Sequence, residues 1–161
     1  MAKVYSSITE EIKEFIQQQK MFFVGTAPSG EGNVNVSPKG YDTFRIVDHQ
    51  RVLYLDYHGS GNETANHLDD NGRITFMWCS FEEQTKIIRV YGKGKVIRKE
   101  DNHFKDLLHT YYNDFQEAII RQIFDIQINK VQVSCGWGVP FMNYLGERPK
   151  LHEKSIKAFI K

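Results

Sequence analysis

Short β-rich runs separated by turn residues fill the first two thirds of the sequence, and this pattern limits the possible fold most strongly. Strands are expected at about residues 21–27, 34–37, 44–47, 51–57, 73–80 and 87–97. Turn residues, including Pro28 and Gly30, lie between the first two runs and make them a candidate hairpin. Closely spaced short strands of this kind are typical of all-β barrels and sandwiches.

Two stretches follow a helical period instead. The first predicted helix presents an apolar face formed by Ile8, Ile12, Phe15 and Ile16. Ser7 followed by Glu10 predicts a capping box at its start. A second helical stretch is expected at about residues 100–121, after which apolar residues alternate strictly from Ile126 to Val133. The last strand is therefore expected to be half buried.

This order of elements predicts a mainly β fold, an antiparallel β-barrel with flanking helices, because closure of a barrel removes exposed strand edges. A two-sheet sandwich is the competing architecture. No repeat or linker divides the 161 residues, so a single domain covering 1–161 is expected. Its predicted parts are an N-terminal helix at about 8–19, a barrel at about 20–98 and 122–135, a helical insert at about 100–121 and a C-terminal tail at 136–161.

Composition argues against several classes of partner. The formal net charge is +1, without a basic stripe, which disfavours nucleic acid. No apolar stretch is long enough to span a membrane, and the N-terminal residues do not resemble a signal peptide. Cys79 and Cys135 lie in apolar runs and are predicted to be reduced core thiols of a cytoplasmic protein. The six histidines lack metal-ligand spacing, so no metal site is predicted.

The segment Gly59-Ser60-Gly61-Asn62-Glu63-Thr64 carries the strongest local signal for a ligand. Glycines allow close backbone approach, and free N–H groups at the start of the following helix attract phosphate. Hydroxyl and amide side chains add further donors, whereas Glu63 opposes phosphate unless its carboxylate points away. An ordinary loop ending in an Asn62 helix cap explains the same residues.

Three other residues are candidates for ligand contact. Lys39, between a proline and a glycine, can meet a phosphate or an electron-rich ring, or it can be a solvated turn lysine. Arg89 alternates onto the polar face of its strand, where it can serve a phosphate or a salt bridge. Trp137 lies between two glycines and can face a planar ligand or fill an interface.

The order and spacing of these segments resemble the FMN-binding split-barrel family that includes pyridoxamine 5'-phosphate oxidase. The segments that carry the resemblance are VNVSPKGYD, LDYHGSGNETANHLDDNGRITFMWCSF and IIRVYGKGKVI. The shorter SPKG, GSGNET and CGWGVP motifs resemble a bacterial subgroup related to that oxidase. The likeness covers roughly Phe22 to Gly146 and implies an antiparallel split β-barrel of the FMN-binding type.

The resemblance also implies a homodimer with the flavin at the subunit interface. By this resemblance the phosphate-side residues are Ser60, Gly61, Asn62 and Thr64. The flavin-flanking strand corresponds to Val36, Ser37, Pro38 and Lys39. Arg89 matches a basic position that faces the cofactor, and Trp137 is expected to approach the flavin from the partner subunit.

Two departures distinguish the chain from the oxidase itself. Asn62, Glu63 and Thr64 stand where the oxidase has a serine-arginine-lysine run, and the oxidase's C-terminal tryptophan and arginine motif is absent. The resulting expectation is an FMN-dependent oxidoreductase whose small-molecule substrate and catalytic residues are unknown. A non-catalytic module that stores flavin, haem or deazaflavin is the alternative, and a barrel without a ligand is a third.

Overall fold

The computed structural model describes residues 2–159. The helices are α1 (Glu10–Gln18), α2 (Glu63–Asn71), α3 (Asn102–Tyr111), the short 3-10 helix η1 (Glu117–Ile119) and α4 (Lys150–Phe159). The strands are β1 (Lys3–Tyr5), β2 (Phe22–Thr26), β3 (Asn35–Lys39), β4 (Phe44–Ile46), β5 (Arg51–Tyr57), β6 (Arg73–Cys79), β7 (Lys86–Arg98) and β8 (Ile120–Cys135).

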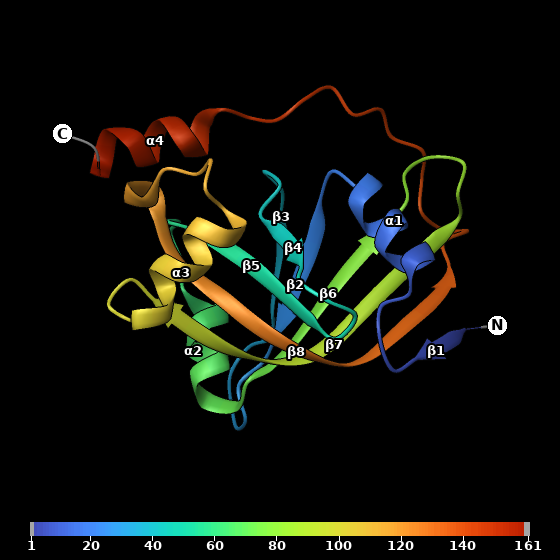
Figure 1. The fold of residues 1–161 in the computed structure, drawn as a ribbon. Helices are drawn as coiled ribbons and strands as arrows, with labels where there is room; N and C mark the ends of the chain where they lie inside the picture. The colour runs from blue at the N-terminus through green and yellow to red at the C-terminus, as the bar shows by residue number, and fades with distance from the viewer. Residues whose placement is uncertain (1, 160–161) are drawn as a thin grey trace.

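All strands of the described residues join one strongly curved sheet, with the helices around it (Figure 1). The strand order is β3-β2-β6-β7-β8-β5-β4, with β1 paired to the far part of β8, and every pairing is antiparallel. β2 and β3 form the predicted hairpin. The fold is therefore an antiparallel half-barrel, as the sequence predicts, and not a sandwich of two sheets.

The principal core lies inside the curve of the sheet. α1 contributes Ile12, Phe15 and Ile16, all buried, which confirms the predicted apolar face of this helix. Aromatic side chains from β2, β4, β5, β6 and β8 pack in the same core, with Phe22 stacked on Trp78 at 5.6 Å between ring centroids. Each such fully buried apolar side chain contributes roughly 1.5–3 kcal/mol to folding.

A second core lies on the outer face of the sheet, between α3 and strands β5 and β8. Phe104, Leu107 and Leu108 of α3 pack there against Leu53 and Leu55. β5 is consequently buried on both faces, because Val52 and Tyr54 point into the principal core. This double burial fixes β5 firmly, and the polar residue near its end, Asp56, is held with it.

Two glycines occupy positions that the backbone geometry restricts to glycine or favours for it. The register of β7 against β8 shifts between Tyr91 and Gly92, and a Cβ atom at Gly92 would lie only 2.5 Å from the backbone oxygen of Gln127. Only glycine fits this close approach at the bulge. Gly72 ends α2 in the left-handed conformation, with φ of 72°.

The structure corrects some sequence expectations. Thr9, not Ser7, caps α1, because extended backbone at Thr9 brings its Oγ1 within 3.3 Å of the donating Ile12 N–H. Cys79 is buried but Cys135 is exposed, since it ends its strand beyond the core. The helical insert contains α3 only as far as Tyr111, followed by loop and η1. β1 was not predicted, because three mostly exposed residues show no alternation.

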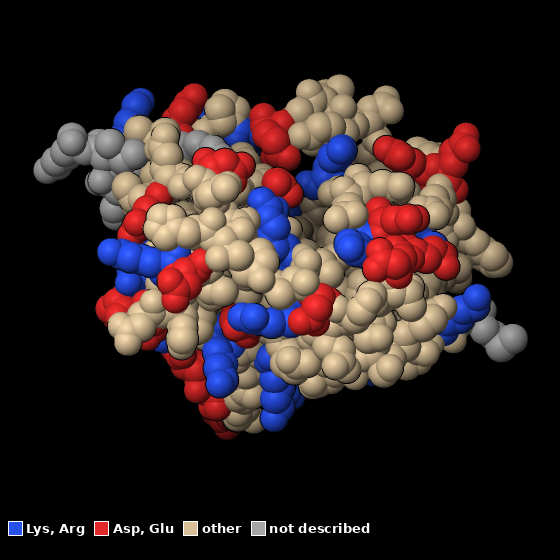
Figure 2. All heavy atoms as spheres, viewed as in Figure 1, with Lys and Arg blue, Asp and Glu red and all other residues tan. Residues whose placement is uncertain are grey.

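The C-terminal segment crosses one end of the sheet before it forms α4 (Figure 1). Several large apolar side chains on this segment are exposed, including Trp137, Phe141 and Leu145. None of the described helices is long and apolar enough to cross a membrane. The face seen in Figure 2 carries basic and acidic side chains interspersed, without a field of a single sign.

Candidate functional site

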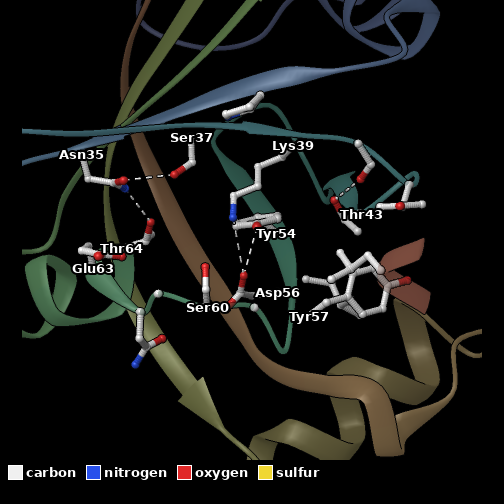
Figure 3. Close-up of a pocket in the computed structure, with 18 residues that line it drawn as sticks. Asn35, Ser37, Lys39, Thr43, Tyr54, Asp56, Tyr57, Ser60, Glu63 and Thr64 are labelled. Carbon is white, nitrogen blue, oxygen red and sulfur yellow. Dashed lines mark hydrogen bonds and ion pairs between the residues drawn. The ribbon is translucent and has the colours of Figure 1, made fainter. Parts of the chain in front are cut away.

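A cavity of about 330 Å³ opens between the end of β3, the floor strand β5 and the loop before α2 (Figure 3). Its polar lining comes from segments far apart in the sequence: Asn35, Ser37, Lys39, Thr43, Asp56, Ser60, Asn62, Glu63 and Thr64. Tyr41, Tyr54, Tyr57 and Leu151 supply larger apolar surfaces. A concave site with a few convergent polar groups is typical of a small-molecule site.

β3 forms one wall by strand alternation. Asn35, Ser37 and Lys39 face the cavity, whereas Val36 lies on the opposite face and is 64% exposed. The Ser37 hydroxyl donates to Asn35 Oδ1 at 3.0 Å, and Asn35 Nδ2 donates to Thr64 Oγ1 at 3.2 Å. These bonds tie the wall to the first turn of α2.

The loop Gly59–Asn62 and the start of α2 form the opposite wall. Asn62 occupies the N-cap position, but its side chain makes no capping hydrogen bond. Among the described residues, no acceptor is found for the backbone N–H groups of Glu63, Thr64 or Ala65. Open N–H groups at a helix start, together with the positive end of the helix dipole, form a favourable site for an anion.

The cavity floor carries a buried carboxylate. Asp56 is 9% exposed, accepts from the Tyr54 hydroxyl at 3.2 Å and from Gln122 Nε2 at 3.0 Å, and lies 3.8 Å from Lys39 Nζ. Burial, with the nearby Asp56 charge second, raises the pKa of Tyr54, so this phenol remains protonated and donates. Asp56 thus anchors the lysine that faces the cavity.

Glu63 brings a second negative charge to the cavity. A Cβ atom at Gly61 would lie 2.3 Å from Glu63 Oε2, so the carboxylate folds back over the glycine loop. It does not point away from the loop, as an undisturbed phosphate site would require. Two acids, Asp56 and Glu63, therefore line the same cavity as Lys39, and Arg121 donates to Gly61 O of the loop at 2.5 Å. The groups left to attract an anion here are mainly N–H and hydroxyl donors.

The turn after β3 is strained. Tyr41 and Asp42 have φ of 63° and 53°, a region that residues other than glycine rarely adopt. The turn is held by the Thr43 hydroxyl, which donates to Gly40 O at 2.9 Å, and by the Tyr41 hydroxyl, which donates to Arg148 O. Burial is the first cause of a raised pKa at the neighbouring Tyr57. The strain presents Tyr41 at the cavity mouth.

A second cavity, of about 380 Å³, adjoins the first across the shared segment 38–41. Its lining is more apolar and includes Met21, Cys79, Phe81, Met142 and Tyr144. The C-terminal segment forms its outer wall. The two cavities therefore share one wall, and the second has the more apolar lining.

The structure brings most of the predicted site residues into the first cavity: Ser37, Pro38, Lys39, Ser60, Gly61, Asn62 and Thr64. Three lie outside it in the same chain. Val36 points away, Arg89 donates to Ser134 Oγ on β8 at 3.2 Å, and Trp137 is 82% exposed. Their expected contact with a cofactor stays a prediction.

Sequence reasoning missed Asn35, Tyr54, Asp56 and Gln122. A signal was present for two of them. Asp56 interrupts the apolar run of β5, and Gln122 interrupts the apolar start of β8. A polar residue within a buried strand needs a partner, and these two partner each other.

Comparisons with known proteins define the family. A profile of the family described as pyridoxamine 5'-phosphate oxidase matches residues 8–135. The pyridoxamine 5'-phosphate oxidase family protein ustO of Aspergillus flavus is 35% identical over 143 residues. That match covers 86% of this chain but 56% of ustO, so the chain spans little more than half of this relative.

Solved structures share the fold. HutZ, the haem storage protein from Vibrio cholerae, matches with a TM-score of 0.56 and 18% identity, over 79% of this chain and 94% of HutZ. An FAD-binding protein from Mesorhizobium loti matches with a TM-score of 0.52 and 12% identity, over 83% and 99%. At these identities the likeness concerns the split-barrel fold alone. With the family profile and ustO, it establishes that the chain belongs to the pyridoxamine 5'-phosphate oxidase family.

Proposed function

We propose that the protein binds FMN in the cavity between β3 and α2 and uses it as an oxidoreductase on a small molecule. The observation that carries this proposal is the open helix start. The first turn of α2 with its open N–H groups, the Ser60 hydroxyl and the Lys39 ammonium all line the same cavity. This donor set suits the phosphate of FMN.

Two acidic residues in the lining, Asp56 and Glu63, oppose the binding of a phosphate because their negative charges repel it. Lys39 and Arg121 balance them in formal charge, so backbone donors must supply the net attraction for phosphate. The flavin, when bound, supplies hydride and electron chemistry. The protein's own residues hold and orient it: Ser37 and Lys39 border the middle of the cavity, and Tyr41 borders its mouth. The adjoining apolar cavity supports an apolar or aromatic substrate.

The proposal includes a homodimer. Several large apolar side chains are left exposed, among them Val36 at 64%, Trp137 at 82% and Leu145 at 97%. Exposed apolar groups of this number mark an interaction surface, and a second copy of the chain is the partner that the family resemblance implies. Arg89 and Trp137 would then reach the flavin of the partner subunit. Sedimentation of the purified protein tests the dimer directly.

The first experiment is an absorbance spectrum of the purified protein, followed by titration with FMN and with riboflavin. We expect flavin bands and tighter binding of FMN, since only FMN carries the phosphate. Lys39→Met should raise the Kd for FMN by about tenfold, the effect of one charge-assisted hydrogen bond. Lys93→Met, an exposed lysine on β7, is the matched control and should leave it unchanged. A protein that binds neither flavin would overturn the proposal.

Turnover separates the enzyme from a storage module, which is the second candidate because HutZ is a haem storage protein on this fold. Reduction of the bound flavin by NADH or NADPH, followed by reoxidation by an acceptor, supports the enzyme. Tight binding of flavin, deazaflavin or haem without turnover supports the module. We also propose a cytoplasmic location, for which the free Cys79 and Cys135 are the support.

A further inference from the structure

Gln122 is a buried polar side chain behind the cavity, on β8. It is 3% exposed and does not line the cavity itself. Its Nε2 group donates to Asp56 Oδ2 at 3.0 Å and to Asn62 Oδ1 at 2.8 Å. Gln122 therefore joins the carboxylate of the cavity floor to the residue at the start of α2.

The bond to Gln122 turns Asn62 away from its usual task. An asparagine at this position normally accepts a hydrogen bond from a backbone N–H of the first turn. Here its Oδ1 accepts from Gln122 and, at 3.3 Å, from Arg121 Nη1. Its backbone, with φ of −140° and ψ of 23°, also departs from the extended conformation that Thr9 uses to cap α1. The cap of α2 is therefore held open.

A β-bulge in β8 allows the neighbouring residues Arg121 and Gln122 both to reach the loop before α2. The pairing of β5 with β8 joins Asp56 to Gln122 and Tyr57 to Ile120, which leaves Arg121 as the extra residue. Neighbouring residues of a regular strand point to opposite faces, whereas a bulge redirects a side chain. Arg121 reaches the carbonyl oxygens of Gly59 and Gly61, in the loop just before the α2 cap.

From these contacts we propose that Gln122 is a positioning residue that keeps the start of α2 open for an anionic ligand. Asp56 orients Gln122, Gln122 holds Asn62, and Arg121 holds the loop backbone. The N–H groups of Glu63, Thr64 and Ala65 remain available as a result. This inference rests on the proposed function for the identity of the anion, the phosphate of FMN.

Variants at Asn62 test the proposal without disturbing the core. Asn62→Ser and Asn62→Ala both remove the contact with Gln122, but only serine can cap the helix. We expect the flavin-free serine variant to melt about 2–4 °C above the alanine variant, as a gained cap predicts. We expect its Kd for FMN to be about tenfold higher than that of the alanine variant, because the hydroxyl takes an N–H that the phosphate needs. The two Kd values for riboflavin should agree.

A second comparison acts on Gln122 itself. Gln122→Met keeps the volume but removes both hydrogen bonds, which leaves Asn62 Oδ1 with only the longer contact to Arg121. We expect Asn62 then to turn and cap α2, so the Kd for FMN rises. Adding Asn62→Ala to this variant should restore FMN binding, a rescue that a purely structural role of Gln122 does not predict. Gln127→Met, on the exposed face of the same strand, is the matched control.

Equal Kd values for FMN in the serine and alanine variants would overturn the proposal, as would the absence of rescue in the double variant. The melting comparison needs no flavin. If neither the wild type nor any variant binds FMN, the proposed function fails. The proposal that the cap of α2 is held open is tested separately, and it fails if the serine variant is no more stable than the alanine variant.

Discussion

Helices α1 and α2 begin in the same way in the sequence and differently in the structure. Each has nine residues, each follows a residue able to cap it, Thr9 or Asn62, and each carries acid in its first turn. Thr9 closes the start of α1 with a hydrogen bond to Ile12 N–H, whereas Asn62 leaves the start of α2 open. A closed helix start contributes to stability, and an open one is available to a ligand.

The surroundings explain the difference. α1 lies against the principal core through Ile12, Phe15 and Ile16. The backbone N–H groups at its start need only a hydrogen-bond acceptor, which Thr9 supplies. α2 begins at the wall of a cavity, and residues of β5 and β8 hold its first turn from behind. Each helix start also has a lysine–carboxylate pair nearby, Lys86–Glu11 at α1 and Lys39–Asp56 at the cavity beside α2. Glu11 is exposed and Asp56 is buried, so variants of the two acids test whether burial distinguishes the two helix starts.

The largest effect is expected from Asp56→Ala. This change leaves the Tyr54 hydroxyl, buried inside the sheet, without its acceptor and removes one of the two acceptors of Gln122. We expect the free energy of unfolding to fall by about 2 kcal/mol, the cost of a buried donor left unpaired. Chemical denaturation of the ligand-free protein measures it.

Glu11→Ala is the matched control. Its ion pair with Lys86 is shorter, at 2.8 Å against 3.8 Å, but Glu11 is largely exposed, and exposed pairs contribute little. Its denaturation midpoint should stay that of the wild type. Equal losses in the two variants would show that burial does not distinguish the two helix starts.

A smaller effect is expected from Thr9→Ala. Loss of the α1 cap should lower the free energy of unfolding by about 1 kcal/mol and leave the Kd for FMN unchanged. Asn62→Ala loses no cap bond at α2, but it removes the hydrogen bonds that Asn62 Oδ1 accepts from Gln122 and Arg121, so a loss of about 1 kcal/mol is expected there as well. Denaturation curves of the two variants measured side by side decide this, and an Asn62→Ala variant as stable as the wild type would mean that these two bonds do not stabilise the start of α2.

Most of the fold follows from local patterns in the sequence. The β-rich apolar runs at residues 51–57 and 87–97 predict strands that the structure has as β5 and β7. The glycines at 92 and 94 predict a bulge or close approach, and both occur. These features depend on neighbouring residues, which a single sequence displays. The position of the α1 cap was wrong because Ser7 and Thr9 are both able to cap, and only the packing of the helix selects one.

The site could be predicted only in part. The SPKG and GSGNET segments are recognisable, and the fold brings Lys39 and Ser60 to one cavity. The hydrogen bond behind the cavity joins Asp56 to Gln122, which are 66 residues apart in the sequence. It depends on a β-bulge between β5 and β8 that no local sequence pattern predicts. Arg89 and Trp137 lie outside this cavity, and their predicted contact with the cofactor, for Trp137 from a partner subunit, stays a prediction.

The smallest expected effects concern pH, and they again differ between the two helix starts. Burial, with the Arg121 and Lys99 charges next, lowers the pKa of His58 below its ordinary value of 6.5. The folded state therefore disfavours the proton, and stability is lost as the pH falls from 6.5 through the lowered pKa. Beside α1, the hydrogen bond and charge of Lys86 lower the pKa of Glu11 below 4.5, so stability present above pH 4.5 is lost only in more acidic solution. Between pH 7.5 and 5.5, His58→Gln should thus lose less stability than the wild type, whereas Glu11→Gln should lose as much as the wild type. If both variants followed the wild type over this range, His58 would not be the source of pH dependence at the cavity.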